Sequence, residues 1–199
     1  MAKQSSTARE RRDDTQARIV AAALQTLRAD GIAGLSARAI ARHGGFNQAL
    51  IFYHFGSLEG LLVAVARSES ERRSALYAPA LNEVATVSQL VAVARRLHEE
   101  EFREGNVAAL TQMLAGASRS DDLAEGVREA LQPWTDLVNE TIERLLKATP
   151  YADVLPHADL TAGVTALFLG IELFTGLHPD RNETSMFETM ELVAAVIDG

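Results

Sequence analysis

Residues 36–55, SARAIARHGGFNQALIFYHF, decide the fold of this 199-residue chain. Ser36 is of a residue type that caps helices, and the helix that it predicts over 36–43 runs into a pair of glycines. Gly45, the second of the pair, permits a sharp turn where a Cβ atom would clash. Asn47 then caps a second short helix over 47–55. Two short helices about a glycine corner predict a helix-turn-helix.

Amphipathic helices are predicted on both sides of this unit. Before it, apolar residues recur along one face of a helix, namely Ile19, Val20, Ala23, Leu24 and Leu27. They predict a helix from residue 13 or 14 to Asp30, ended by Gly31. After the unit, Ser57 begins a further helix, with Glu59 favourably placed in its first turn.

The rest of the chain also has the pattern of helices. Hydrophobic residues make up 47% of the sequence but aromatic residues only 6%, a mix that favours helices over strands. The predicted segments are 57–77 ending near Pro79, 88–104, 106–114, 121–147 with a kink at Pro133, 159–177 and 184–197. We therefore expect an all-α protein with two domains, over residues 1–60 and 61–199.

Charge is distributed unevenly between these two parts. Residues 1–60 carry eight basic and five acidic side chains, whereas residues 61–199 carry eleven basic and twenty-two acidic ones. The first part is thus net +3 although the whole chain is net −8. Such asymmetry indicates nucleic acid binding at one end, although a solvated basic tail gives the same balance.

The N-terminal segment resembles the DNA-binding domain of the TetR family of bacterial repressors. The matching positions are Gly31, Ser36, Ile40-Ala41, Gly45, Tyr53-His54-Phe55, Ser57, Glu59 and Leu61-Leu62. The resemblance implies that the helix over 47–55 enters a groove of double-stranded DNA. The residues expected to contact DNA are Ser36, Arg38, Arg42, Asn47, Gln48, Ala49, Phe52, Tyr53 and His54. Gln48 is able to read adenine by a bidentate contact, but a surface glutamine equally often faces water.

Two features depart from the family pattern. The family places a lysine after the serine that begins the fourth helix, and Leu58 stands there in this chain. The expected recognition helix also has no Lys or Arg between Asn47 and Phe55. Contacts to the DNA backbone therefore depend on Ser36, Arg38, Arg42, Tyr53, His54 and the arm residues Arg9, Arg11 and Arg12.

The C-terminal part is expected to hold a dimer interface and an effector pocket, as the resemblance implies. A homodimer also follows from physics, because one short helix contacts too few base pairs for tight specific binding. The expected interface residues are Val164, Leu167, Ile171, Phe174, Phe187, Met190 and Ala194, for which burial within one protomer is the alternative. The expected pocket residues, for a small hydrophobic effector, are Phe102, Met113, Trp134, Leu137, Val138 and Phe168, each of which fits a plain core equally well.

Other classes of protein receive little support. The chain has no cysteine, which excludes disulfides, zinc ribbons and cysteine nucleophiles. Phosphate-binding, metalloprotease, hydrolase and dinucleotide motifs do not occur, so we expect neither an enzyme nor a cofactor or metal site. The polar start and the short apolar runs predict a cytoplasmic protein without a membrane partner. A helical interaction dimer that has lost DNA binding and a transcriptional activator of the same fold remain open as alternatives.

Overall fold

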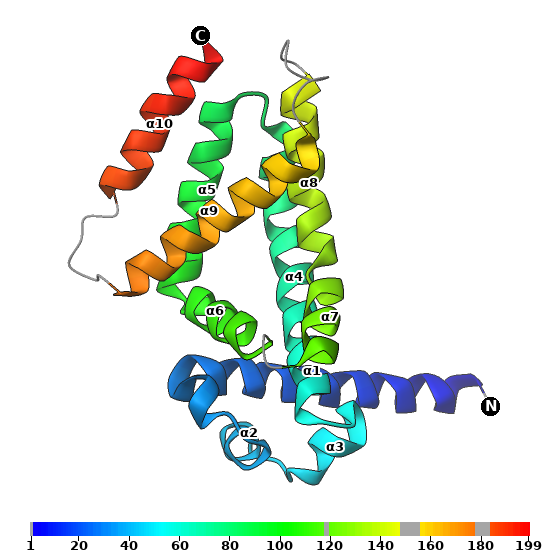
Figure 1. Ribbon diagram of the computed structural model, residues 1–199. Helices are drawn as coiled ribbons and strands as arrows, with labels where there is room; N and C mark the ends of the chain where they lie inside the picture. Colours follow the sequence, from blue (N-terminus) through cyan, green and yellow to red (C-terminus); the bar gives the residue numbers. More distant parts are fainter. Residues whose placement is uncertain (1, 118–119, 148–155, 178–183) are drawn as a thin grey trace. The chain divides into compact units, whose positions relative to one another are not determined.

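The computed structural model describes residues 2–117, 120–147, 156–177 and 184–199. Within these ranges the chain forms ten α-helices, which confirms the all-α prediction (Figure 1). They are α1 Ala2–Gly34, α2 Ala37–Gly44, α3 Ala49–Phe55, α4 Leu58–Glu83, α5 Val87–Arg103, α6 Asn106–Ala117, α7 Asp121–Ala130, α8 Gln132–Lys147, α9 His157–Leu177 and α10 Thr184–Asp198.

Helix α1 is longer than predicted and contains a kink. Gly31 has a left-handed φ of 68°, as a helix end requires, but one further helical turn follows to Gly34. Directly after the kink, the amide of Ile32 donates a hydrogen bond to the side-chain oxygen of Gln112 at 2.5 Å. A residue eighty positions further along the chain therefore stabilises the kink.

The two prolines act differently from the prediction. Helix α4 continues through Pro79 to Glu83, so its predicted end was wrong. The guanidinium of Arg144 donates to the carbonyl oxygens of Leu81 and Val84, which stabilises the extra turn. The predicted kinked helix over 121–147 is two helices, and Pro133 lies in the first turn of the second, where an amide has no partner within the helix.

The backbone divides into two compact units. The first comprises residues 1–69 with 112–131, and the second comprises residues 70–111 with 132–199. This division differs from the boundary expected after residue 60, because the start of α4 and the segment 112–131 group with the N-terminal helices. Close packing explains the grouping: a Cβ atom on Gly126 would lie 2.8 Å from a methyl group of Val63.

Each unit has its own core. In the first unit, the fully buried side chains from α1 to α4 are Ile19, Ala23, Leu27, Ile40, Ile51, Leu61 and Val65. In the second unit, one cluster joins α5, α9 and α10 through Val91, Ile171, Phe187 and Ala194. A neighbouring cluster contains Tyr77, Leu81 and Leu97.

No single helix in the described part of the chain is long and apolar enough to cross a membrane. The bent pair α3 and α4, which meet at 68°, satisfies the length and composition test only when the two are taken together.

Candidate nucleic-acid interface and effector cavity

The corner between α2 and α3 has the predicted geometry. Ser36 is extended and its hydroxyl accepts the amide of Ala39 at 3.2 Å, so it caps α2. Gly45 has a φ of 65° and its amide donates to the carbonyl of Ala41, which closes the helix. The chain then turns within three residues into α3, so the predicted helix-turn-helix is confirmed.

Helix α2 is fixed to α1 by a polar contact that the sequence did not disclose. Thr26 is fully buried, and its hydroxyl lies 3.0 Å from Nδ1 of His43. Asp30, one turn further along α1, lies 3.9 Å from the same nitrogen. The position of Thr26 on the apolar face of α1 was the available signal that it is buried, but its partner on α2 was not readable.

Helix α3 is anchored on one side and open on the other. Ile51 is fully buried and attaches the helix to the core of its unit. The helix begins later than predicted, at Ala49, and Gln48 occupies its N-cap position without a side-chain cap bond. Asn47, the predicted cap, lies one residue earlier and accepts the amide of Ala49 at 2.9 Å. Facing outward are Asn47, Gln48, Ala49, Phe52 and Tyr53, the last two with 50% and 77% of their surface exposed. Such exposure of two aromatic side chains on one short helix is typical of an interaction surface.

His54 behaves differently from its neighbours. It is half-buried, and its ring meets the ring of Tyr53 edge-on with centroids 5.0 Å apart. Its Nδ1 atom is buried and has no hydrogen-bond partner in the described part of the structure. His54 therefore supports the orientation of Tyr53 more than it extends the open face of α3.

Basic side chains lie on α1 and α2. Arg38 and Arg42 are exposed on α2, and Arg9, Arg11 and Arg12 are exposed on α1. Arg42 lies 3.6 Å from a carboxylate oxygen of Asp30, and its side chain is 69% exposed. A surface ion pair of this kind is weak, so it leaves Arg42 available to a phosphate group.

The start of α4 has the predicted cap but lacks a charge. The Ser57 hydroxyl accepts the amide of Gly60 at 3.0 Å. Leu58, the next residue, is half-buried. A Cβ atom on Gly60 would lie 2.3 Å from the carbonyl oxygen of Phe55, so a glycine is needed where α3 and α4 meet.

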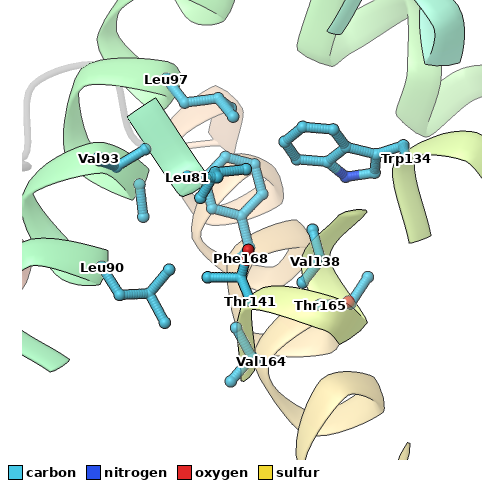
Figure 2. Close-up of a pocket in the computed structure, with 11 residues that line it drawn as sticks. Leu81, Leu90, Val93, Leu97, Trp134, Val138, Thr141, Val164, Thr165 and Phe168 are labelled. Atoms are coloured by element: carbon cyan, nitrogen blue, oxygen red, sulfur yellow. The ribbon is translucent and has the colours of Figure 1, made fainter. Parts of the chain in front are cut away.

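The second unit contains an apolar cavity. Figure 2 shows its wall, which α4, α5, α8 and α9 build from Leu81, Leu90, Val93, Ala94, Leu97, Trp134, Val138, Thr141, Val164, Thr165 and Phe168. The cavity has about 70 Å³ of free space. The wall contains two threonine hydroxyl groups, those of Thr141 and Thr165. The hydroxyl of Thr141 donates to the carbonyl oxygen of Leu137.

Three of the six predicted pocket residues meet at this cavity, namely Trp134, Val138 and Phe168. Leu137 packs beside them against the cluster of Tyr77, Leu81 and Leu97. The prediction differs from the structure for the other two. Phe102 is 41% exposed and stacks on His98, and Met113 is buried among the residues of the first unit. The contribution of α4 was missed, and α5 contributes residues other than the predicted Phe102, because apolar periodicity marks a buried face without telling core from cavity.

The predicted interface residues separate into two groups. Ile171, Phe187 and Ala194 are buried in the core of their own protomer, and Met190 packs partly buried against them, as the alternative interpretation had it. Val164 and Leu167 are 39% and 52% exposed, and the side chain of Phe174 lies outside the described residues. Three exposed apolar side chains on α10 were missed: Leu192, Val193 and Val196, between 55% and 82% exposed.

Buried charges next to the cavity are paired with one another. Glu101 of α5 is 1% exposed, and its two carboxylate oxygens each lie 2.7 Å from the guanidinium of Arg72. Arg73 donates to one of them at 3.1 Å. The hydroxyl of Tyr77 donates a hydrogen bond to Glu100 at 2.7 Å. Burial raises the pKa of Tyr77, and this hydrogen bond raises it further. These bonds join α4 to the C-terminal end of α5.

This fold and this open helix define a helix-turn-helix DNA-binding protein. Residues 19–65 match the family described as bacterial regulatory proteins, tetR family. An uncharacterized HTH-type transcriptional regulator of Mycobacterium tuberculosis is 24% identical over 176 residues, which cover 87% of this chain and 88% of the relative. Residues 19–65 therefore carry the DNA-binding domain of this family, and most of the chain is similar to a transcriptional regulator.

Solved structures show the same fold. The transcriptional regulator FadR from Bacillus subtilis, in complex with stearoyl-CoA, superposes with a TM-score of 0.74 at 12% identity. The match covers 89% of this chain and 96% of FadR. The multidrug binding protein EbrR, complexed with malachite green, has a TM-score of 0.62 at 25% identity, covering 92% of this chain and 98% of EbrR.

Proposed function

We propose that this regulator is a repressor that binds a palindromic operator as a homodimer and leaves it when a small apolar molecule enters the cavity of the second unit. We place it in the cytoplasm, where its DNA partner lies, and we expect it to act by binding and not by catalysis. The observation that carries the proposal is the open face of α3. Its outward residues include Gln48 and Tyr53, while Ile51 fixes the helix from behind.

The contacts to DNA divide into two kinds. Gln48, Ala49 and Phe52 are placed to meet base edges in the major groove, the amide by hydrogen bonds and the apolar groups by contact with thymine methyl groups. Phosphates are met by Ser36, Arg38, Arg42 and Tyr53, together with the arm residues Arg9, Arg11 and Arg12. Since α3 itself carries no Lys or Arg, most of the salt-dependent affinity comes from outside the recognition helix.

A second copy of the chain is the expected partner of the exposed apolar residues on α10. Val196 is 82% exposed and Leu192 is 70% exposed, which is unfavourable for side chains that face water permanently. A symmetric pair of such helices buries these residues and presents two recognition helices to two half-sites. The exposed residues Val164 and Leu167 of α9 are a candidate extension of this interface.

The effector is expected to be a small apolar molecule, because leucine, valine, alanine and aromatic side chains make up most of the cavity wall. FadR, which has the same fold, was solved with stearoyl-CoA, and EbrR was solved with malachite green. Their ligands are large compared with the free space in this cavity, so an effector here must widen it. Release of DNA is then a population shift toward a state that the effector prefers.

The DNA-binding part is tested by fluorescence anisotropy with labelled DNA from upstream of the regulator's own coding sequence. Wild-type protein is expected to bind it at least a thousandfold more tightly than unrelated competitor DNA, the lower end of the usual specificity range. Gln48→Ala should lose about ten- to hundredfold in specific affinity and little in non-specific affinity. Arg103→Ala, which changes an exposed residue of α5, is the control.

One rival function is supported by specific residues. Leu58 and the uncharged α3 also fit a helical interaction dimer that no longer binds DNA. The same titration decides between them, since such a dimer binds operator and competitor DNA equally weakly. An activator of the same fold would also bind the operator. Deleting its gene would lower transcription of a reporter gene, whereas deleting the gene of a repressor would raise it.

A further inference from the structure

We propose that occupation of the cavity weakens the dimer through α5, a helix that forms part of the cavity wall and also holds α10 by apolar and polar contacts. This inference rests on the proposed function for the existence of an effector and of a homodimer. It adds the route by which one controls the other. The route is carried by the contacts on the two faces of α5.

Two adjacent faces of α5 have different neighbours: one lines the cavity and the other packs on α10. Leu90, Val93 and Leu97 belong to the cavity wall. Val91 is buried against Phe187 and Ala194 of α10. Ala94 takes part in both, because it lines the cavity and also packs against the α10 cluster. Figure 1 shows α5 beside α10, so the same helix contacts both the cavity and the helix that presents the exposed apolar residues.

Two polar contacts attach α10 to the N-terminal two thirds of α5. At the end of α10, the carboxylate of Asp198 accepts the amides of Val87 and Ser88 at 2.8 and 2.9 Å. Amides in the first turn of a helix have no partner within the helix, so a carboxylate is favoured at this end of α5. Two turns earlier, Glu191 accepts a hydrogen bond from Arg95 at 3.2 Å. With the apolar cluster between them, these contacts make α10 follow any movement of this part of α5.

The C-terminal end of α5 is held in a different way. The buried Glu101 is bonded to Arg72 and Arg73, and Glu100 is bonded to Tyr77, all three on α4. Breaking such buried, charge-assisted bonds costs much more than shifting apolar side chains past one another. The part of α5 that yields most readily is therefore the part that carries α10.

A ligand has to make α5 yield. The cavity offers about 70 Å³, room for roughly two water molecules at about 30 Å³ each, whereas pockets for small molecules measure about 300–1,000 Å³. The opposite wall, α8, is bonded to α4 through the Ser70 hydroxyl and the Trp134 amide at 3.1 Å. The remaining walls are α5 and α9, and of these α5 is bonded to α10 through Asp198 and Glu191. Widening that displaces the start of α5 therefore moves α10 from the position in which two copies associate.

The test uses the full-length protein and N-phenyl-1-naphthylamine, a neutral apolar fluorescent probe. The chain contains a single tryptophan, Trp134 in the cavity wall, so energy transfer from it to the probe reports binding at this place. Sedimentation velocity then gives the dissociation constant of the dimer with and without saturating probe. We expect the probe to raise this constant about fivefold or more, the usual lower range of coupling between sites.

A matched pair of variants tests the route. Arg95 bonds to Glu191 on α10 and also to Glu99 within α5. Glu191→Gln combined with Asp198→Asn removes the polar contacts between the two helices, and Glu99→Gln removes only the bond within α5. The double variant should still bind the probe, with an affinity that no longer differs between monomer and dimer, and lose most of the shift in dimer dissociation. Glu99→Gln should keep the shift.

Two results would overturn this inference and leave the proposed function intact. They are a dimer constant that the probe leaves unchanged within twofold, and an equal shift in wild type and in the double variant. In both cases operator binding and probe binding persist, so the proposed function stands. A probe that binds without energy transfer from Trp134, or does not bind, overturns the effector cavity and the inference with it. Loss of specific operator binding in wild type contradicts the proposed function instead.

Discussion

Leu58 stands at the start of α4, where the family that the N-terminal segment resembles places a lysine. It follows Ser57, whose hydroxyl caps α4, and it is half-buried. The cap and the fold of the corner are therefore retained while one contact to the DNA backbone is missing. Specific binding by α3 does not require that contact, but the dependence of affinity on salt does reflect it.

Restoring the charge should change this salt dependence. Leu58→Lys is expected to steepen the slope of log affinity against log salt by about 0.9, the contribution of one neutralised phosphate. Anisotropy titrations over a series of KCl concentrations measure the slope. Leu76→Lys makes the same change at an exposed leucine further along α4 and should leave the slope unaltered. Equal slopes for Leu58→Lys and wild type would show that position 58 does not face a phosphate.

At the scale of the element, the corner between α2 and α3 depends on both of its glycines for different reasons. The clash expected for a Cβ atom at Gly45 is absent, because no atom lies within 4 Å of it; Gly45 is left-handed, so its cost on substitution is conformational. Gly44 is helical, but a Cβ there would lie 2.1 Å from the ring of Phe46 and 2.9 Å from the methyl group of Ala22. Substitution of Gly44 is therefore costly for a steric reason, because the added Cβ atom disturbs the packing between α1 and α2.

The two glycines predict an order of stabilities. Gly45→Ala should lower the free energy of unfolding by about 1–2 kcal/mol, the cost of a left-handed alanine. Gly44→Ala should lower it by about 3 kcal/mol or more, because Phe46 must leave its place and α2 must move away from α1. Urea unfolding followed by circular dichroism measures both. A Gly44→Ala variant as stable as Gly45→Ala would contradict the packing described for this corner.

The contact between α10 and α5 should respond to acid. Hydrogen bonds from Ser88 and from the Val87 amide lower the pKa of Asp198 below its usual value. A carboxylate with a lowered pKa in the folded state stabilises the protein above the unfolded-state pKa of about 3.9, and this stability is lost as the pH falls through the folded-state value. The melting temperature of Asp198→Asn should therefore fall less than that of wild type below about pH 4. Melting temperatures of wild type and Asp198→Asn that fall by the same amount between pH 7 and pH 3 would contradict this.

The elements also show what the sequence was able to predict. Ser36, Gly45 and Ser57 gave the corner and the starts of α2 and α4, because caps and left-handed glycines act within a few residues. The ends of α1 and α4 were not predictable, since Gln112 and Arg144 stabilise them from distant parts of the chain. The cavity wall was only partly predicted for the same reason. Trp134 and Phe168 are marked by their size, whereas the contribution of α5 depends on how the helices meet.

At the scale of the whole molecule, a homodimer accounts for features that one protomer leaves without a role. Val196 and Leu192 remain exposed on α10 although Phe187 and Ala194 on the same helix are buried against α5. A single recognition helix also reads too few base pairs for tight and specific binding. Both features are explained when two copies associate through α10.

The dimer predicts a difference between two charged substitutions. Val196→Asp should raise the dissociation constant of the dimer at least a hundredfold, because a carboxylate would be buried without a partner. Leu76→Asp introduces the same charge at another exposed position and should leave the dimer intact. Sedimentation velocity over a range of protein concentrations compares them. An unaffected dimer in Val196→Asp would place the interface elsewhere.

The central claim is that α3 of two copies enters the major groove of DNA. DNase I footprinting of the region upstream of the regulator's own gene tests it most directly. We predict two symmetric protected half-sites whose centres are about one helical turn apart, or a multiple of it, and loss of the footprint with Tyr53→Ala but not with Arg103→Ala. Protection that survives Tyr53→Ala, or the absence of any protected site at protein concentrations that saturate the dimer, would contradict the account.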